Sequence, residues 1–153
     1  MRAVLTRVKS ASVTIGGEIA GIIGKGFLVL LGVHEDDTEA EALKIADKIC
    51  GLRIFEDENG KMNVNPADAG ARFLIISQFT LFADCKSRRP GFSHAARPDK
   101  AIPLYELVIA ECRNRGFDVE TGEFHLLHIA VQRTFDGDGM IRITADERGW
   151  HIA

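Results

Sequence analysis

The longest apolar run of the chain, GFLVLLGV at residues 26–33, constrains the fold more than any other feature. Its apolar residues are continuous rather than alternating, which is typical of a strand that is buried on both faces. Residues 73–76, FLII, begin a second strand of the same kind. Neither run is long enough to cross a membrane as a helix. We therefore expect these segments to be central strands of a buried sheet.

Shorter apolar segments surround these two strands. Residues 2–8 and 11–15 are rich in Val, Ile, Leu and Thr, as strands are. A Gly-Gly pair then suits a tight turn, after which EIAGII at 18–23 is expected to return as a third strand. Further strands are predicted toward the end of the chain, at residues 117–120, 126–134 and 140–144.

Two helices are predicted between these strands. A capping box formed by Thr38 and Glu41 opens the first, whose apolar stripe extends to about residue 51. The second covers about residues 99–115, with Pro103 in its first turn. The order strands, helix, strands, helix, strands predicts an α/β domain with a mixed sheet, or two sheets, and helices packed outside.

Composition and charge exclude several classes of protein. With 153 residues, 46% hydrophobic and 27% charged, the chain fits one folded domain rather than a disordered segment. A net charge of −3 argues against a protein that coats duplex DNA, whereas a protein that grips one end of an RNA need not be basic. Three cysteines without a C-x-x-C motif indicate reduced thiols, and no secretory signal is visible. A cytoplasmic protein without membrane contact is expected.

Polar side chains follow the buried run 73–76. Ser77, Gln78 and Thr80 bring two hydroxyls and an amide to the end of a strand, where buried polar groups need partners. Because strand side chains alternate, Gln78 and Thr80 are expected on one face and could line a pocket. Backbone N–H groups freed at the strand end could bind an oxyanion. The alternative is that a neighbouring loop satisfies these groups structurally.

Several motifs resemble those of the D-aminoacyl-tRNA deacylases. They are SQFTLFAD at 77–84, RRPGF at 88–92, LRIFEDENGKMN at 52–63 and the opening residues 1–33, with matching spacing to about residue 124. These enzymes hydrolyse the ester that joins a D-amino acid, or glycine, to the 3′ end of tRNA. They are homodimers with the active site at the subunit interface. The resemblance implies one layered, barrel-like domain over residues 1–153, with mixed, mainly antiparallel sheets and two main helices outside.

The resemblance also implies roles for individual residues. Ser77, Gln78, Phe79 and Thr80 would form the aminoacyl pocket, with Thr80 and nearby backbone amides holding the scissile ester. Binding, orientation and the terminal 2′-hydroxyl of the RNA would carry the hydrolysis, with no cofactor and no metal. The sequence is compatible with this, because it contains no Gly-x-Ser-x-Gly elbow and no Ser-His-Asp order stands out.

Cationic residues gather in the irregular segment 84–100. Arginine and lysine bind phosphates, and Phe92 could stack on the terminal adenine of the tRNA. Next to the SQFT motif, this pattern favours tRNA-end binding over an ordinary solvated loop. The predicted tRNA-binding residues are Lys86, Arg88 and Arg89, with Arg97 and Lys100 nearby.

Arg7 matches an arginine of the family that braces the loop selecting the chirality of the amino acid. The alternative from the residues alone is a strand arginine that pairs with a carboxylate. We therefore count Arg7 among the predicted substrate-binding residues, with that alternative left open.

The resemblance breaks after Phe124. The family ends with a Gly-Pro pair that reaches into the partner's pocket and excludes L-amino acids. Here Gly137 and Asp138 take that place, and either one can align with the proline depending on a one-residue insertion. A cis bond before a residue other than proline costs about 2.5–4 kcal/mol, against about 0.5–1 kcal/mol before proline. Residues 125–153 are therefore a divergent segment in which the filter is altered or lost.

Three rival functions remain open from the sequence. The first is a related deacylase with relaxed chirality. The second is a non-catalytic homologue that binds tRNA ends. The third is a metal hydrolase that uses His125 and His128, which would share one face if that segment were helical.

Overall fold

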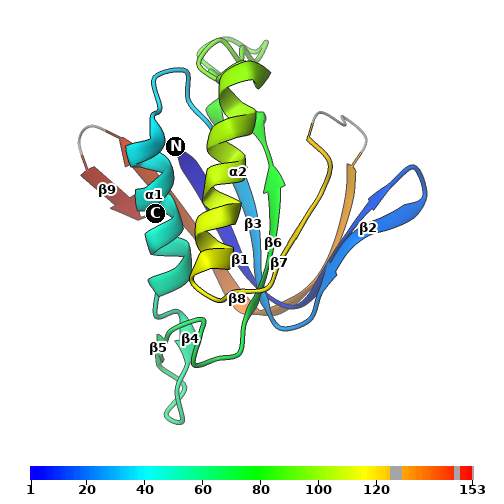
Figure 1. Ribbon diagram of the computed structural model, residues 1–153, viewed down its shortest axis with the longest axis vertical. Coiled ribbons are helices and arrows are strands. Elements are labelled where there is room, and N and C mark those ends of the chain that lie inside the picture. The colour runs from blue at the N-terminus through cyan, green and yellow to red at the C-terminus, as the bar shows by residue number, and fades with distance from the viewer. Residues whose placement is uncertain (125–128, 147–148, 153) are drawn as a thin grey trace.

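The structure is a computed structural model that describes residues 1–124, 129–146 and 149–152, with side chains described for residues 1–124. Within these ranges one mixed sheet is covered by two helices on the same face (Figure 1). In chain order the elements are β1 (Arg2–Ile15), β2 (Glu18–Ile23), β3 (Gly26–Gly32), α1 (Glu39–Gly51), β4 (Phe55–Glu56), β5 (Met62–Val64), β6 (Arg72–Ser77), a 3₁₀ helix (Phe79–Phe82), α2 (Pro98–Asn114), β7 (Val119–Thr121), β8 (Ile129–Asp146) and β9 (Gly149–Ile152).

The sheet runs in the order β7-β6-β3-β1-β8-β9, with β2 also paired to β1. β6 is parallel to both β3 and β7, while β1 is antiparallel to β2, β3 and β8, and β8 is antiparallel to β9. The predicted mixed, mainly antiparallel architecture with helices outside is confirmed. β4 and β5 form a separate hairpin between α1 and β6.

β1 is one long strand, whereas the sequence analysis predicted two. Its first half, from Arg2 to Val8, pairs with β3, and its second half, from Ala11 to Ile15, pairs with β2. β8 likewise runs through the gap between the two strands predicted at 126–134 and 140–144, although residues 125–128 lie outside the described part. Because β2 and β3 share one side of β1, the sheet bends between them. A Cβ on Gly21 would lie 2.9 Å from the Thr121 carbonyl oxygen, so β2 folds back over β7 and gives the domain its barrel-like form.

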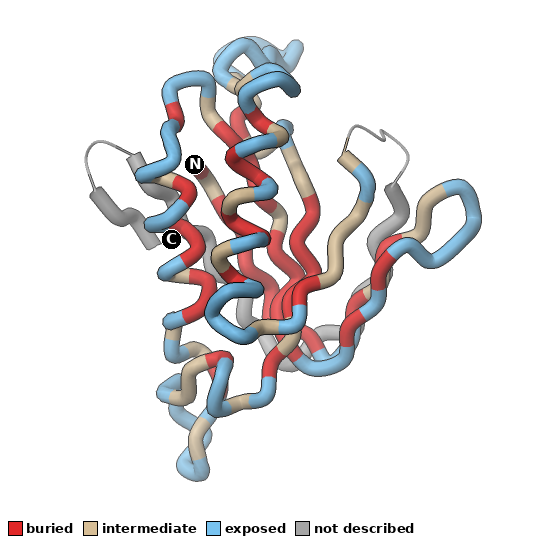
Figure 2. Tube along the Cα trace, in the orientation of Figure 1, coloured by how far each residue is buried: buried red, intermediate tan, exposed pale blue. Residues whose placement is uncertain are grey.

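Cores on both faces of the sheet explain why the central strands are continuously apolar. On the helix side, alternate residues of β3 and β6, such as Phe27 and Phe73, pack against α1 and α2. On the other side, Leu28, Leu74 and Ile76 pack under the second half of β1 and β2. Figure 2 shows the buried positions along these strands and on the inner sides of the helices.

The helix boundaries follow local signals. The capping box is confirmed, because Glu41 accepts the backbone N–H of Thr38 at 2.8 Å. The Thr38 hydroxyl also donates to the Glu41 carboxylate at 2.6 Å, and this hydrogen bond, together with that of the Thr38 backbone N–H, lowers the pKa of the Glu41 carboxyl. α2 begins at Pro98, so Pro103 lies inside the helix and not in its first turn as predicted. No helix in the described ranges is long and apolar enough to span a membrane.

Two of the cysteines meet between the helices. Cys50 of α1 and Cys112 of α2 are buried free thiols that share a hydrogen bond, which raises the pKa of Cys112 together with burial, and Cys85 is exposed. These thiols belong to the packing of α1 against α2, away from the end of β6.

Candidate active site

The polar segment after β6 forms a tight turn at one edge of the sheet. β6 ends at Ser77, and the Gln78 backbone N–H donates to the Leu31 carbonyl of parallel β3 at 2.8 Å. A 3₁₀ helix follows from Phe79 to Phe82. The prediction that strand alternation continues through Gln78 and Thr80 is therefore wrong. Gln78 and Thr80 still meet, because the Gln78 Nε2 donates to the Thr80 Oγ1. The predicted pairing is present, but the turn produces it.

Two residues that the sequence analysis missed hold this turn in place. The Arg2 guanidinium donates to the Leu81 carbonyl and lies 4.7 Å from the centroid of the Phe82 ring. Gly32, the last residue of β3, lies directly under the turn. A Cβ on Gly32 would lie 3.1 Å from the Gln78 carbonyl oxygen and 3.1 Å from a Phe82 ring carbon. A side chain there would push the turn away from β3.

Hydrogen-bond donors are left available at the start of the turn. Within the described residues, the backbone N–H groups of Phe79 and Thr80 have no acceptor, as is usual for the first residues of a helix. The Thr80 oxygen already accepts from Gln78, which leaves its own hydroxyl proton free to donate. Such a group of donors can bind a carbonyl oxygen and stabilise the negative charge that develops on it during acyl transfer.

The described residues place no general base on the hydroxyls of this turn. Ser77 is half-buried and Thr80 is exposed, and within residues 1–124 no histidine or carboxylate is hydrogen-bonded to either hydroxyl. A nucleophilic serine or threonine needs such a base to be activated. The turn is therefore suited to binding and polarising a carbonyl rather than to attacking it.

The segment after the turn brings a second aromatic ring to the site. Phe79 and Phe92 meet edge to face with their ring centroids 5.2 Å apart. Both side chains remain well exposed, at 44% and 40%. Paired aromatic rings that stay open to solvent offer an apolar platform for a planar group.

The cationic residues lie at the tip of the next loop. Asp84 and Gly91 pair through two backbone hydrogen bonds of 2.8 and 2.9 Å, which close the loop between them. Lys86 lies 3.7 Å from the Asp84 carboxylate and is almost fully exposed. Arg88 and Arg89 are exposed, and their guanidinium groups form no ion pair with any residue in the described ranges. They are available for an anionic ligand.

Arg7 lies elsewhere in the fold. Its buried guanidinium donates to the Ile54 carbonyl at 2.9 Å and to the Glu56 carboxylate at 3.0 Å. The carboxylate pairing left open by the sequence is therefore present. Glu56 is exposed, so the carboxylate side of this pair faces solvent.

The strand register brings Gly137 and Asp138 next to Arg7. In the β1–β8 pairing, Thr6 faces Met140 and Val8 faces Phe135, so residues 136–139 bulge opposite Arg7. The peptide bonds of the described backbone include no cis bond. The three predicted substrate-binding residues Arg7, Gly137 and Asp138 therefore lie at one place in the sheet.

That place is not the turn after β6. Along the paired strands Arg7 is level with Phe27, which pairs with Phe73 at the start of β6, whereas Ser77 at the other end pairs with Leu31. β3 lies between Arg7 and β6, β1 and β3 lie between the bulge of β8 and β6, and four residues along β6 separate Phe73 from Ser77. One copy of the chain does not bring the predicted catalytic and chirality-selecting residues together.

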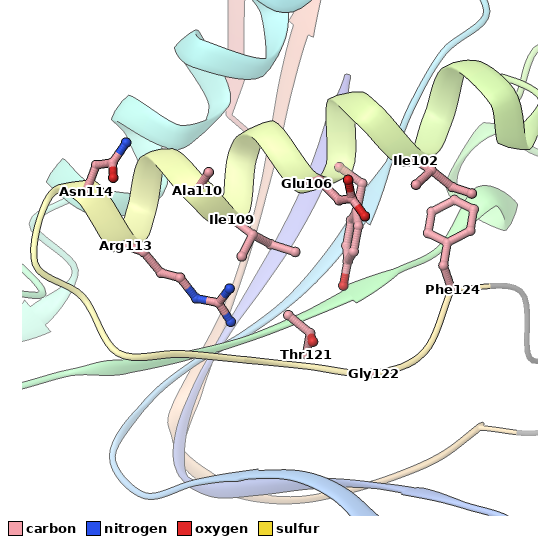
Figure 3. A pocket seen from close by; sticks show the side chains of 10 residues that line it. Ile102, Glu106, Ile109, Ala110, Arg113, Asn114, Thr121, Gly122 and Phe124 are labelled. Carbon is pink, nitrogen blue, oxygen red and sulfur yellow. The ribbon is translucent and has the colours of Figure 1, made fainter.

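An open pocket lies between α2 and the segment that follows β7 (Figure 3). Its volume is about 550 Å³, and none of the predicted site residues lines it. Arg113 and Glu106 project into it from α2, opposite Thr121, with Phe124 at one end. Tyr105 also lines the pocket; its hydroxyl donates to the Ile75 carbonyl at 2.7 Å, and burial raises the pKa of this hydroxyl.

A comparison with protein-family models matches residues 4–143 to the family described as D-Tyr-tRNA(Tyr) deacylase. The chain belongs to this deacylase family. The match reaches well past residue 124, where we expected the likeness to end, and includes most of β8. Residues 125–143 thus belong to the part of the chain that matches the family.

Curated deacylases are similar over nearly their whole length. A D-aminoacyl-tRNA deacylase of Thermus aquaticus is 51% identical over 149 residues, covering 97% of each chain. Another, of Symbiobacterium thermophilum, is 49% identical over 148 residues, covering 96% of this chain and 97% of the relative.

Solved structures share the deacylase fold. One described as a c-Myc DNA unwinding element binding protein superimposes with a TM-score of 0.89 at 36% identity, covering 95% of this chain and 99% of that one. A probable eukaryotic D-amino acid tRNA deacylase superimposes with a TM-score of 0.79 at 16% identity, which shows the fold alone.

Proposed function

We propose that this protein hydrolyses the ester bond of D-aminoacyl-tRNA and releases the free D-amino acid and tRNA, a proofreading reaction in translation. The observation that carries the proposal is the group of hydrogen-bond donors in the turn at 77–80. The relatives named D-aminoacyl-tRNA deacylase are about half identical to this chain over nearly their whole length. Glycyl-tRNA is a second substrate. A pocket that selects D-amino acids by sterically excluding an L side chain does not exclude glycine, because glycine has no side chain.

Catalysis in this proposal rests on binding and polarisation. The backbone amides of Phe79 and Thr80, with the Thr80 hydroxyl, hold the ester carbonyl oxygen and the oxyanion formed when the ester is attacked. Gln78 fixes the orientation of the Thr80 hydroxyl. The oxygen that attacks is water, oriented by the terminal 2′-hydroxyl of the bound RNA. The protein contributes position and charge stabilisation, which need no side-chain nucleophile.

The remaining exposed residues fit the end of a tRNA. The Phe79–Phe92 platform suits the terminal adenine, and a base stacked on an aromatic ring gains about 1–3 kcal/mol. Lys86, Arg88 and Arg89 would contact the phosphates beside it. With a net charge of −3 and cations at one loop tip, the chain suits an RNA end better than duplex DNA.

The proposed active site is completed by a second copy of the chain. The register keeps Arg7, Gly137 and Asp138 away from Ser77 within one copy, so a homodimer is needed to bring the bulge of β8 to the partner's turn. A second copy could also cover apolar residues that one copy leaves open to solvent, since Ile19 and Ile22 of β2 are 63% and 55% exposed. We place the reaction in the cytoplasm, where aminoacyl-tRNA is used.

Hydrolysis of matched D-tyrosyl-, L-tyrosyl- and glycyl-tRNA tests this function. We expect rapid loss of D-tyrosine and glycine with L-tyrosine spared. Loss of D- and L-tyrosine at equal rates would replace the proposal with a deacylase of relaxed chirality. No loss of any substrate, with tRNA still bound, would replace it with a non-catalytic binder. Sedimentation should find a dimer at assay concentrations, and an active monomer would refute the shared site.

A further inference from the structure

Two imidazoles and a carboxylate come together beside the candidate active site. His34 and Glu35 follow β3, and His94 lies in the loop before α2. The closest ligand atoms of these three side chains all lie within 4.8 Å of one another. We propose that His34, Glu35 and His94 bind a divalent transition metal ion of the zinc class.

The backbone holds the two halves of this cluster together. His34 pairs with Ala95 in a β-bridge, and the Glu35 backbone N–H donates to the His94 carbonyl at 3.0 Å. The Asp37 carboxylate accepts the His34 backbone N–H at 2.6 Å. Main-chain contacts therefore position the backbone of all three residues before any ion arrives, which lowers the entropy cost of binding one.

The distances suit a small tetrahedral ion. The His94 Nδ1 lies 3.2 Å from the Glu35 Oε1. Zn–N and Zn–O bonds of about 2.0–2.2 Å place two ligands of a tetrahedral ion roughly 3.4 Å apart, so an ion can replace the proton between these atoms. The His34 and His94 rings are parallel, with centroids 5.8 Å apart, and the His34 Nδ1 accepts the Asp36 backbone N–H at 3.2 Å. His34 would therefore bind the ion through its Nε2, or after giving up this contact, and one ring must turn so that both imidazoles face the same ion.

The chemistry of the ligands selects the class of metal. Two imidazoles and one carboxylate favour Zn²⁺ and its neighbours among the late first-row ions over Mg²⁺ or Ca²⁺, which prefer all-oxygen sites. Three protein ligands leave a fourth position for water. The Asp36 carboxylate, 3.7 Å from the His34 Nδ1, adds negative charge at the rim, and the Lys100 amine is already engaged by the Glu35 carbonyl.

The site would connect the metal to the candidate turn. The His34 ring also packs edge-on against Phe82, with centroids 5.1 Å apart, and Phe82 ends the 3₁₀ helix. A bound ion would fasten the loop that carries Phe92 to the end of β3. The proposal does not depend on the deacylase activity and assigns the ion no part in it.

Zinc binding to the chelator-treated full chain tests the proposal. We expect one Zn²⁺ per chain by calorimetry, a rise in the midpoint of thermal unfolding on adding Zn²⁺, and a cobalt derivative with the visible absorption of a four-coordinate ion. His94→Gln and Glu35→Gln should each weaken binding roughly tenfold or more. Both side chains are about half exposed, so the variants should fold.

Control variants distinguish this site from other side chains of the protein that could bind zinc. Replacing His125 and His128 together by Gln, or Cys85 by Ser, should leave the zinc affinity unchanged. Equal affinity in wild type and His94→Gln, or loss of binding in either control, would overturn the assignment. Absence of saturable zinc binding by the wild type would overturn it as well and would leave His94 and Glu35 as a surface ion pair.

Discussion

Phe79 and Phe92 meet edge to face at 5.2 Å, although the two residues come from different loops and both rings stay exposed. The contact joins the turn that carries the hydrogen-bond donors to the loop that carries the cations. An apolar pair left open beside polar groups is best explained by a planar ligand that covers it.

Phe92→Ala should therefore weaken substrate binding more than it lowers the stability of the fold. Loss of about 1–3 kcal/mol of base stacking predicts a rise in KM of roughly tenfold or more, with kcat changed less. The Tm should stay near the wild-type value because the ring is exposed. Met62→Ala, which truncates another exposed apolar side chain on β5, is the control. Equal KM values for the two variants would contradict the stacking role.

Gly32→Ala should disturb the turn from beneath. The added Cβ would come within 3.1 Å of the Gln78 carbonyl, so either the turn or β3 must move. Overpacking of this kind costs about 1–3 kcal/mol of stability, and we expect a lower kcat as the donors shift. Gly24→Ala, with nothing within 4 Å of its Cβ, should change neither quantity. A folded Gly32→Ala protein with full activity would show that the position of the turn does not matter.

Charge reversal at Arg88 and Arg89 should weaken the binding of tRNA without slowing the hydrolysis of the ester itself. The double change to Glu is expected to raise the Kd for tRNA and to lower the salt dependence of binding, because each lost phosphate contact removes close to one unit of slope. Hydrolysis of a short aminoacyl-adenosine substrate should be unaffected. Lys61→Glu, in the β4–β5 hairpin at the other end of the molecule, is the matched control (Figure 1). An unchanged Kd for the double variant would remove the loop from the tRNA site.

Local sequence signals predicted the elements well, and long-range contacts decided the rest. The capping box at Thr38 and Glu41 was predictable because both partners lie within one helical turn. The continuous apolar runs of β3 and β6 correctly indicated burial on both faces. The 3₁₀ helix after Ser77 was not predicted, because the polar alternation of SQFT suits a strand equally well.

The residues that shape the candidate site were the least visible in the sequence. Gly32 and Arg2 hold the turn through contacts with residues far along the chain, and no local pattern marks them. His34 and His94 likewise come together only through the bridge between the end of β3 and the loop before α2. The histidines that the sequence suggested for a metal, His125 and His128, are close together in the chain and lie outside the described residues.

The most direct measurement is single-turnover hydrolysis of D-tyrosyl-tRNA by the wild type and by Thr80→Val, with Thr14→Val as a control. Thr80→Val removes the hydroxyl while keeping the shape of the side chain. Loss of one oxyanion donor predicts a rate lower by about 10²–10³-fold, with unchanged tRNA affinity and unfolding midpoint. Thr14→Val should behave as the wild type. A Thr80→Val protein that hydrolyses D-tyrosyl-tRNA at the wild-type rate would contradict the assignment of this turn as the active site.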